Sequence, residues 1–137
     1  MARDIYHNTV RDALMADGWI ITHDPFPVSY GGQTLYVDLG AEQMLAAERG
    51  GQRIAVEVKS FIGNSAMRDL QLALGQYLMY RMIIQEQEPN RLLYLAVSRL
   101  VFESYLRQGL GQFTLESYGV KLLIFEESER TIHRWIE

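Results

Sequence analysis

The chain has 137 residues, of which 48% are hydrophobic and 22% charged, and it carries a formal net charge of −4 and no cysteine. This length fits one domain, residues 1–137, with a substantial core, and the lack of cysteine excludes disulfides, thiolate catalysis and cysteine-based zinc sites. The acidic charge argues against non-specific coating of DNA, because that mode of binding needs many cations to neutralise phosphates.

The N-terminal end, Met1–Asp4, lacks the apolar stretch of a secretory signal. No window of the sequence comes near the roughly 18 uncharged apolar residues that a membrane-spanning helix needs. We therefore expect a cytoplasmic protein without membrane contact.

The first half of the chain predicts one helix followed by strands. Apolar residues at helical spacing predict a helix from Asp4 to about Asp17, which Gly18 ends. A strand is expected over Trp19–His23, and the Gly31-Gly32 pair predicts a turn. Thr34–Leu39 alternates as a strand with Asp38 on its polar face.

Residues 41–49 have a helix-forming composition, but the glycine pair that follows predicts a hairpin, so we favour a strand for their second half. Ser65 is a suitable N-cap for a long helix that runs to about Gln87. The remaining expected elements are strands at Arg53–Lys59, Arg91–Val97, Val120–Phe125 and Thr131–Trp135, and a short helix at Val101–Arg107. This order predicts an α/β (α+β mixed) domain, with a central mixed sheet flanked by α-helices.

The strand over Arg53–Lys59 carries the strongest chemical signal. Its apolar residues share one face, whereas Glu57 and Lys59 project from the other face and aim at the same spot. With Asp38 from a neighbouring strand end and the carbonyl of Val58, the two carboxylates form a minimal site for Mg²⁺ or Mn²⁺. The Lys59 ammonium is placed to orient the attacking water and to stabilise charge on a phosphate. The same pattern also fits a solvated Glu57–Lys59 pair, with Asp38 as a turn cap.

Gln76 and Tyr80 lie four positions apart on the helix that follows this strand, so they share one helix face. Their side chains can hold the lysine or a DNA phosphate. The alternative is that Tyr80 belongs to the core and Gln76 caps a helix contact. Two further candidates are weaker: His7 is expected to be an exposed residue of the first helix, and Glu42 can replace Asp38 as a carboxylate.

The residues resemble a known family, XisH, along nearly the whole chain and in order. The matching phrases are Asp24-Pro25, Val37–Glu42, Ile54–Phe61, Ala73–Tyr77 and Leu93–Val97. Members of this family are described as controlling factors for excision of the fdxN element, a DNA segment removed from cyanobacterial chromosomes during heterocyst differentiation.

The resemblance implies the restriction-endonuclease-like fold of the PD-(D/E)xK superfamily. Asp38 then matches the first acidic position, Glu57 and Lys59 the (D/E)xK element, and Gln76 with Tyr80 the Q-x-x-x-Y element of RecB-like nucleases. Val37 stands where the superfamily has proline, and His7 stands at the acidic position of the first helix.

The leading hypothesis is a metal-dependent endonuclease that acts on DNA during element excision, with phosphodiester hydrolysis as its reaction. The family also implies a XisI-type protein partner, and restriction-like nucleases are frequently homodimers. The alternative is a non-catalytic regulatory factor that retains the nuclease fold and binds XisI, DNA or the recombinase. Its support is the acidic net charge together with His7.

Overall fold

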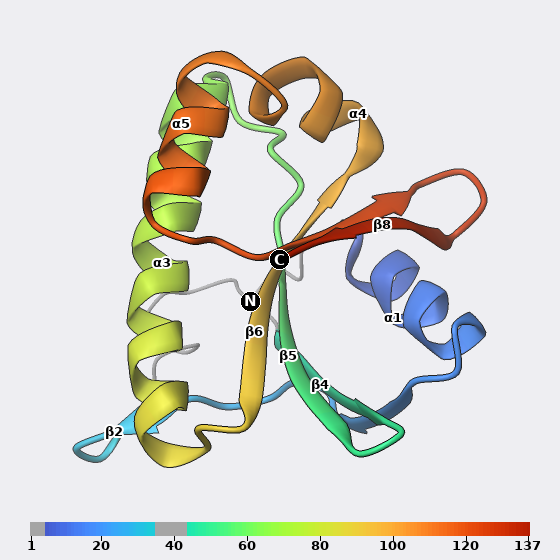
Figure 1. The fold of residues 1–137 in the computed structure, drawn as a ribbon, viewed down its shortest axis with the longest axis vertical. Coiled ribbons are helices and arrows are strands. Elements are labelled where there is room, and N and C mark those ends of the chain that lie inside the picture. Colours follow the sequence, from blue (N-terminus) through green and yellow to red (C-terminus); the bar gives the residue numbers. More distant parts are fainter. Residues whose placement is uncertain (1–4, 35–43) are drawn as a thin grey trace.

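The computed structural model describes residues 5–34 and 44–137. Its centre is a six-stranded sheet in the order β1-β4-β5-β6-β7-β8, and a separate hairpin joins β2 to β3 (Figure 1). The three strands β5, β6 and β7 run parallel to one another, and the other neighbours in the sheet are antiparallel. The strands are β1 (Ile20–His23), β2 (Ser29–Tyr30), β3 (Gln33–Thr34), β4 (Met44–Arg49), β5 (Gln52–Val58), β6 (Arg91–Ser98), β7 (Leu122–Glu126) and β8 (Thr131–Ile136).

Helices flank the sheet on both sides, with α1 on one side and α3 and α5 on the other (Figure 1). The helices are α1 (His7–Ala16), α3 (Ala66–Gln87), α4 (Arg99–Val101), the π-helix η1 (Phe102–Leu106) and α5 (Gly109–Ser117). The expectation of a mixed α/β domain with a central mixed sheet is therefore confirmed. Among the described residues, no helix is both long and apolar enough to cross a membrane.

Local sequence signals explain where the central elements begin and end. The hydroxyl of Ser65 accepts a hydrogen bond of 3.2 Å from the backbone N–H of Arg68, as predicted for the N-cap of α3. Residues 44–49 form β4, which confirms the strand expected for the second half of 41–49. Gly50 and Gly51 have φ angles of 55° and 84°, a conformation that the turn from β4 to β5 requires and that glycine adopts without strain.

The core consists of two clusters, one on each face of the sheet, and β5 contributes to both. Ile54, Val56 and Val58 pack with Val10 and Leu14 of α1. Ala55 points to the other face and joins the cluster that contains Ala73 and Tyr77 of α3. Because both faces are covered, β5 is a nearly continuous apolar run, and a polar side chain within it needs a specific explanation.

Helix α5 was not predicted, and its glycines explain why. Gly109 and Gly111 lower the helix propensity of this segment. However, a Cβ atom at position 111 would lie 2.1 Å from the backbone oxygen of Tyr105, so the close packing of α5 against η1 requires glycine there. The short helix expected at Val101–Arg107 is present but begins at Arg99, and its second part has π geometry. Of the strand expected over Thr34–Leu39, only Thr34 lies within the described residues.

Candidate functional site

Glu57 lies at the carboxyl end of β5 and is fully buried, with 0% of its surface exposed. It pairs with Met44 of β4 and Leu95 of β6, so a strand covers it on each side. Glu57 follows Ala55 by two residues on the strand, and Ala55 belongs to the cluster on the α3 side of the sheet, so Glu57 faces the same side. The alternative of a solvated Glu57–Lys59 pair is therefore wrong for Glu57.

Lys59 follows β5 directly, and its backbone N–H donates to the carbonyl of Ala96 at 3.0 Å, which keeps it in line with the strand. The lysine lines a cavity of about 280 Å³ between the end of β5 and the first turns of α3. The other lining residues are Phe61, Ile62, Gly63, Asp69, Leu72 and Ala73. An ammonium group in a cavity at a strand end is positioned to bind an anionic group.

The loop after Lys59 is held in an unusual conformation. Phe61 has a φ angle of 55°, which is rare for a bulky residue, and backbone outliers of this kind cluster at functional sites. The N–H of Gly63 donates to Oδ2 of Asp69 at 2.9 Å, and a Cβ on Gly63 would lie 2.6 Å from Oδ1 of the same carboxylate. The loop therefore lies tightly against the first turn of α3 and fixes one wall of the cavity.

Asp69 was not predicted as a site residue, although it lies in the same cavity as Lys59. Asp69 lies in the first turn of α3, where a carboxylate interacts favourably with the helix dipole, and this alone explains an acidic residue there. The sequence therefore cannot distinguish a helix-stabilising aspartate from one that also serves the cavity.

Gln76 and Tyr80, whose spacing predicted one shared helix face, are both buried, with 4% and 0% of their surfaces exposed. Gln76 lies on α3 three residues after Ala73, which lines the Lys59 cavity. Within the described part of the chain, the amide oxygen of Gln76 is buried and has no hydrogen-bond partner. Tyr80 belongs to the core cluster, as the alternative interpretation held.

The predicted carboxylates Asp38 and Glu42 lie outside the described residues. Val58, whose carbonyl was the predicted third ligand, is 1% exposed and precedes Lys59. Across residues 5–34 and 44–137 no three histidine or acidic side chains are grouped as a metal site. Glu57 and Gln76 carry oxygen donors, the type of ligand that Mg²⁺ and Mn²⁺ prefer, and both side chains are buried.

His7 is not the exposed helix residue that was predicted, since only 1% of its surface is accessible. Its Nε2 lies 2.7 Å from Oδ1 of Asp24, and Arg11 approaches the other oxygen of that carboxylate at 3.5 Å. Asp24, in the segment between β1 and β2, is thus a partner of His7. This contact gives the buried imidazole a structural role.

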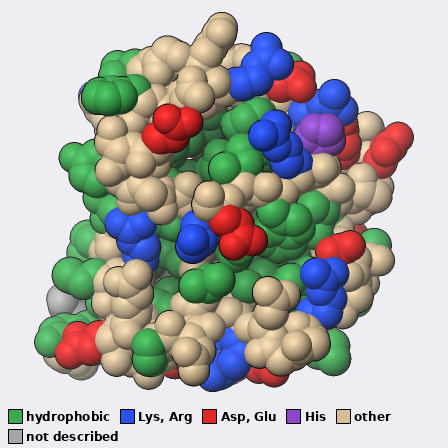
Figure 2. Space-filling view, in the orientation of Figure 1, with side chains coloured by type: hydrophobic (Ala, Val, Ile, Leu, Met, Phe, Trp, Pro, Cys, Tyr) green, Lys and Arg blue, Asp and Glu red, His purple; other side chains and the backbone are tan. Residues whose placement is uncertain are grey.

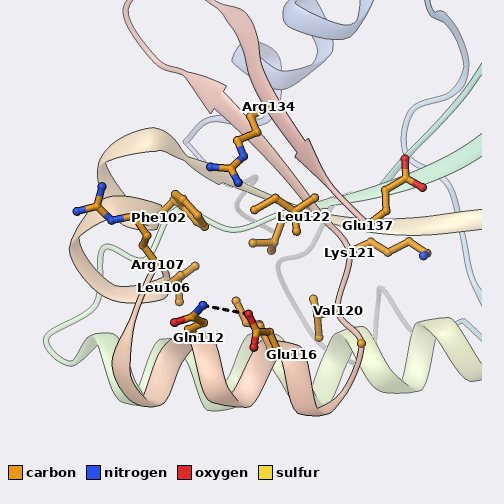
Figure 3. A pocket seen from close by; sticks show the side chains of 13 residues that line it. Phe102, Leu106, Arg107, Gln112, Glu116, Val120, Lys121, Leu122, Arg134 and Glu137 are labelled. Atoms are coloured by element: carbon orange, nitrogen blue, oxygen red, sulfur yellow. Dashed lines mark hydrogen bonds between the residues drawn. The ribbon is translucent and has the colours of Figure 1, made fainter.

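A larger cavity, of about 480 Å³, lies away from the predicted residues, among η1, α5 and β8 (Figure 3). Phe102, Leu106 and Leu122 give it an apolar wall, and the guanidinium of Arg134 reaches over the Phe102 ring at 5.7 Å. None of the predicted site residues lines it.

Comparisons with known proteins show which family the sequence and the fold resemble. A family model described as XisH protein matches residues 1–133. The crystal structure of an XisH family protein from Nostoc punctiforme has a TM-score of 0.89 and 38% identity, and the match covers 98% of this chain and 100% of that one. The crystal structure of a fdxN element excision controlling factor protein from Anabaena variabilis has a TM-score of 0.88 and 38% identity, with 96% and 98% covered. Among curated proteins there is no significant match.

Proposed function

The chain belongs to the XisH family, and from that premise we propose that it is a metal-dependent, restriction-endonuclease-like protein that acts on DNA during the excision of a chromosomal element. The process comes from the relative in Anabaena variabilis, which is described as a fdxN element excision controlling factor. The chemistry rests on one observation: a fully buried Glu57 lies two residues before Lys59, which lines a cavity together with Asp69, Leu72 and Ala73 of α3.

In this proposal Glu57 and Asp38, with the carbonyl of Val58, hold Mg²⁺ or Mn²⁺. Such a cation, when bound, polarises the phosphate and lowers the pKa of a bound water. The ammonium of Lys59 binds the phosphate and orients the water. Gln76 and Tyr80 support the site from α3, where packing against the sheet holds both side chains in place.

The burial of Glu57 supports this assignment on energetic grounds. A carboxylate withdrawn from water costs several kcal/mol (about 2–7 for a polar group without compensation) unless hydrogen bonds or positive charge offset the loss of hydration. At the end of a strand that is otherwise apolar, a valine or leucine would stabilise the fold without that cost. An acidic residue at this fully buried position therefore supports the proposal of a cation site, where a carboxylate is required and an apolar residue cannot serve.

The decisive experiment exploits the fact that the chain has only two lysines, Lys59 and Lys121. Labelled single-stranded, duplex and branched DNA is incubated with the protein and Mn²⁺ or Mg²⁺, and wild type is compared with Lys59→Ala and Lys121→Ala. We expect cleavage by wild type and Lys121→Ala, and at least about a hundredfold loss in Lys59→Ala, the scale at which a positioned catalytic group contributes.

Equal loss in both variants would mean that any lysine on the surface matters, which contradicts the assigned role of Lys59. Absence of cleavage on every substrate, with a purified XisI-type protein included, would contradict nuclease activity itself.

One observation favours a second candidate, a non-catalytic regulatory factor that binds DNA or a XisI-type protein. Many of the arginines are engaged in ion pairs with carboxylates, and positive and negative side chains are interspersed on the face shown in Figure 2. A mixed surface gives little electrostatic attraction for the DNA backbone. Melting temperatures that stay constant across Mg²⁺ and Mn²⁺ concentrations, together with stable binding of the XisI-type protein, would favour this candidate.

A further inference from the structure

The face of α3 that points away from the sheet carries a row of exposed apolar side chains. Leu72, Met79 and Met82 are 56%, 43% and 62% exposed, and Gly75, also exposed, completes the row. Their spacing alternates between three and four residues, which places all four on one stripe of the helix. Ala73, Tyr77 and Tyr80 form the opposite, core-facing stripe. Hydrophobic side chains accordingly gather along the left edge of the molecule in Figure 2, where α3 lies.

Single exposed apolar residues are normal on protein surfaces, but a contiguous row along a helix marks a contact with another molecule. Helix α5 lies alongside α3 (Figure 1) and also carries exposed apolar residues, Leu110 and Phe113, which are 58% and 70% exposed. A stable interface buries about 800 Å² on each partner, so residues next to α3 would also take part in it.

Charged residues continue the row at each end, and both are placed against the helix dipole. Arg68 lies in the first turn of α3 and Glu86 in the last. A cation is unfavourable near a helix N-terminus and an anion near a C-terminus, by a few tenths of a kcal/mol each. Both side chains are exposed, and within the described ranges neither has an ion pair. The contacts within a single copy of the chain therefore do not explain why Arg68 and Glu86 stand at these positions.

The row is symmetric about its own centre, and this symmetry identifies the partner. Arg68 and Glu86, Leu72 and Met82, and Gly75 and Met79 are three pairs with the same midpoint, position 77. When two copies of α3 pair antiparallel about a two-fold axis at that midpoint, each residue meets the other member of its pair. Opposite charges then meet at both ends, and apolar side chains meet between them.

We propose that α3 is the interface of a homodimer, in which two copies of this helix pack antiparallel with Arg68 against Glu86 of the second copy. Leu72 packs on Met82 of the second copy, and Met79 lies over Gly75, where the missing side chain allows close approach. A Cβ at Gly75 has no atom within 4 Å in the isolated chain, so nothing inside the protein itself requires glycine there. Glycine in the middle of a helix is otherwise unfavourable.

The charge pairs give an experiment that depends on the register. Sedimentation equilibrium or light scattering over a range of protein concentrations measures the dimer dissociation constant of wild type, Arg68→Glu, Glu86→Arg and the double variant. Each single variant places like charges together at both ends, and we expect its dissociation constant to rise roughly tenfold at low salt. The double variant restores opposite charges and should dimerise as wild type does.

The most specific test of the register is to mix Arg68→Glu with Glu86→Arg and to measure the association of the mixture. In that heterodimer both end contacts join Arg to Glu, so the mixture should associate more tightly than either variant alone. Added salt should reduce the differences, because the charges are exposed. Arg107→Glu, an exposed arginine outside α3, is the control and should leave dimerisation unchanged.

Gly75→Gln separates the interface from stability. Glutamine is a good helix former and has open space at this position, so the melting temperature at low protein concentration should rise. The same substitution fills the space left for Met79 and should weaken dimerisation at least about tenfold, since misfit in packed contacts is costly.

Wild-type protein that stays monomeric at all concentrations would overturn the proposal. So would a mixture of single variants that associates no better than its components, or charge variants that keep the dimer but lose binding of a XisI-type protein, which would assign the row to that partner. Because no DNA or metal enters these measurements, their failure is distinct from failure of the nuclease proposal.

Discussion

Nε2 of His7 lies 2.7 Å from Oδ1 of Asp24, and this contact ties the first turn of α1 to the segment that follows β1. Only 1% of His7 is exposed, and the Asp24 side chain is 14% exposed, so water replaces the interaction poorly. The next core residues along the chain, Phe26 and Val28, pack on the α3 side of the sheet. The pair thus fixes the point where the chain passes from one face of the sheet to the other.

We predict that Asp24→Ala lowers the free energy of unfolding by about 1–3 kcal/mol, because it leaves a buried imidazole without this hydrogen-bond acceptor. Urea denaturation followed by circular dichroism measures the change. Asp12→Ala is the matched control: Asp12 pairs with Arg130 at 2.7 Å, but both side chains are more than 40% exposed. An exposed pair contributes between about 0 and 1 kcal/mol. If both variants lost the same free energy of unfolding, burial would not be the reason why the His7–Asp24 contact stabilises the fold.

Tyr77 links three parts of the fold through one oxygen. Its hydroxyl donates to the carbonyl of Leu93 in β6 at 2.9 Å and accepts from the backbone N–H of Lys121 at 3.1 Å. Tyr77→Phe removes both bonds without changing the ring, so we expect a loss of about 1–3 kcal/mol in the free energy of unfolding. Tyr118→Phe, at a side chain that is 51% exposed, should change it by less than about 0.5 kcal/mol. Denaturant titration of both variants distinguishes these outcomes.

Alkaline pH should destabilise the protein through its buried tyrosines. Burial raises the pKa of Tyr77 above its usual value of about 10, and burial together with the carboxylate of Glu137 raises the pKa of Tyr94. The native state then retains protons that the unfolded chain releases, so stability is constant below pH 10 or so and falls as pH rises above it.

The measurement is the free energy of unfolding between pH 8 and pH 11 or so, the range that brackets the usual tyrosine pKa. The chain has eight tyrosines and no cysteine, so we assign the decline to tyrosine. Tyr77→Phe should make the decline shallower, whereas Tyr118→Phe should not. If stability fell with the same slope in wild type, Tyr77→Phe and Tyr118→Phe, the decline would come from groups other than Tyr77.

Glu57→Gln tests the proposed cation site without changing side-chain size. A ligand that binds only the native state at a hundred times its dissociation constant stabilises it by about 2.7 kcal/mol, or roughly 8 °C in melting temperature for a domain of this size. We expect this rise for wild type in Mn²⁺ and its loss in Glu57→Gln. Glu116→Gln, at an exposed carboxylate bonded to Gln112, should respond as wild type does. A full rise in Glu57→Gln would remove Glu57 from the set of ligands.

Much of the fold was predictable because local signals and burial agree along most of the chain. The N-cap at Ser65 and the apolar run of β5 are each visible in a few residues. Helix α5 was missed because the reason for Gly111 lies in its contact with Tyr105, and sequence alone shows only a poor helix former. Long-range packing of this kind leaves no periodic pattern.

The site was predictable in part, for a similar reason. Spacing alone predicts that Gln76 and Tyr80 share one face of a helix, and the structure buries both side chains. It also places Lys59 at the end of β5 in a cavity lined by the first turns of α3. The burial of His7 depends on Asp24, a residue brought close by folding and not by sequence. Asp38 lies outside the described residues, so its place relative to Glu57 stays a prediction.

The coverage of β5 on both faces and along both edges has a consequence for amide hydrogen exchange. The N–H groups of Ala55 and Val56 lie in the middle of the sheet, between β4 and β6, so solvent reaches them only when the whole domain opens. Their exchange rates should report the global free energy of unfolding, whereas those of Ile62 and Gly63 report the loop alone. Glu57 is thus fixed to the part of the protein that opens last, and the loop beside Lys59 opens many times before it.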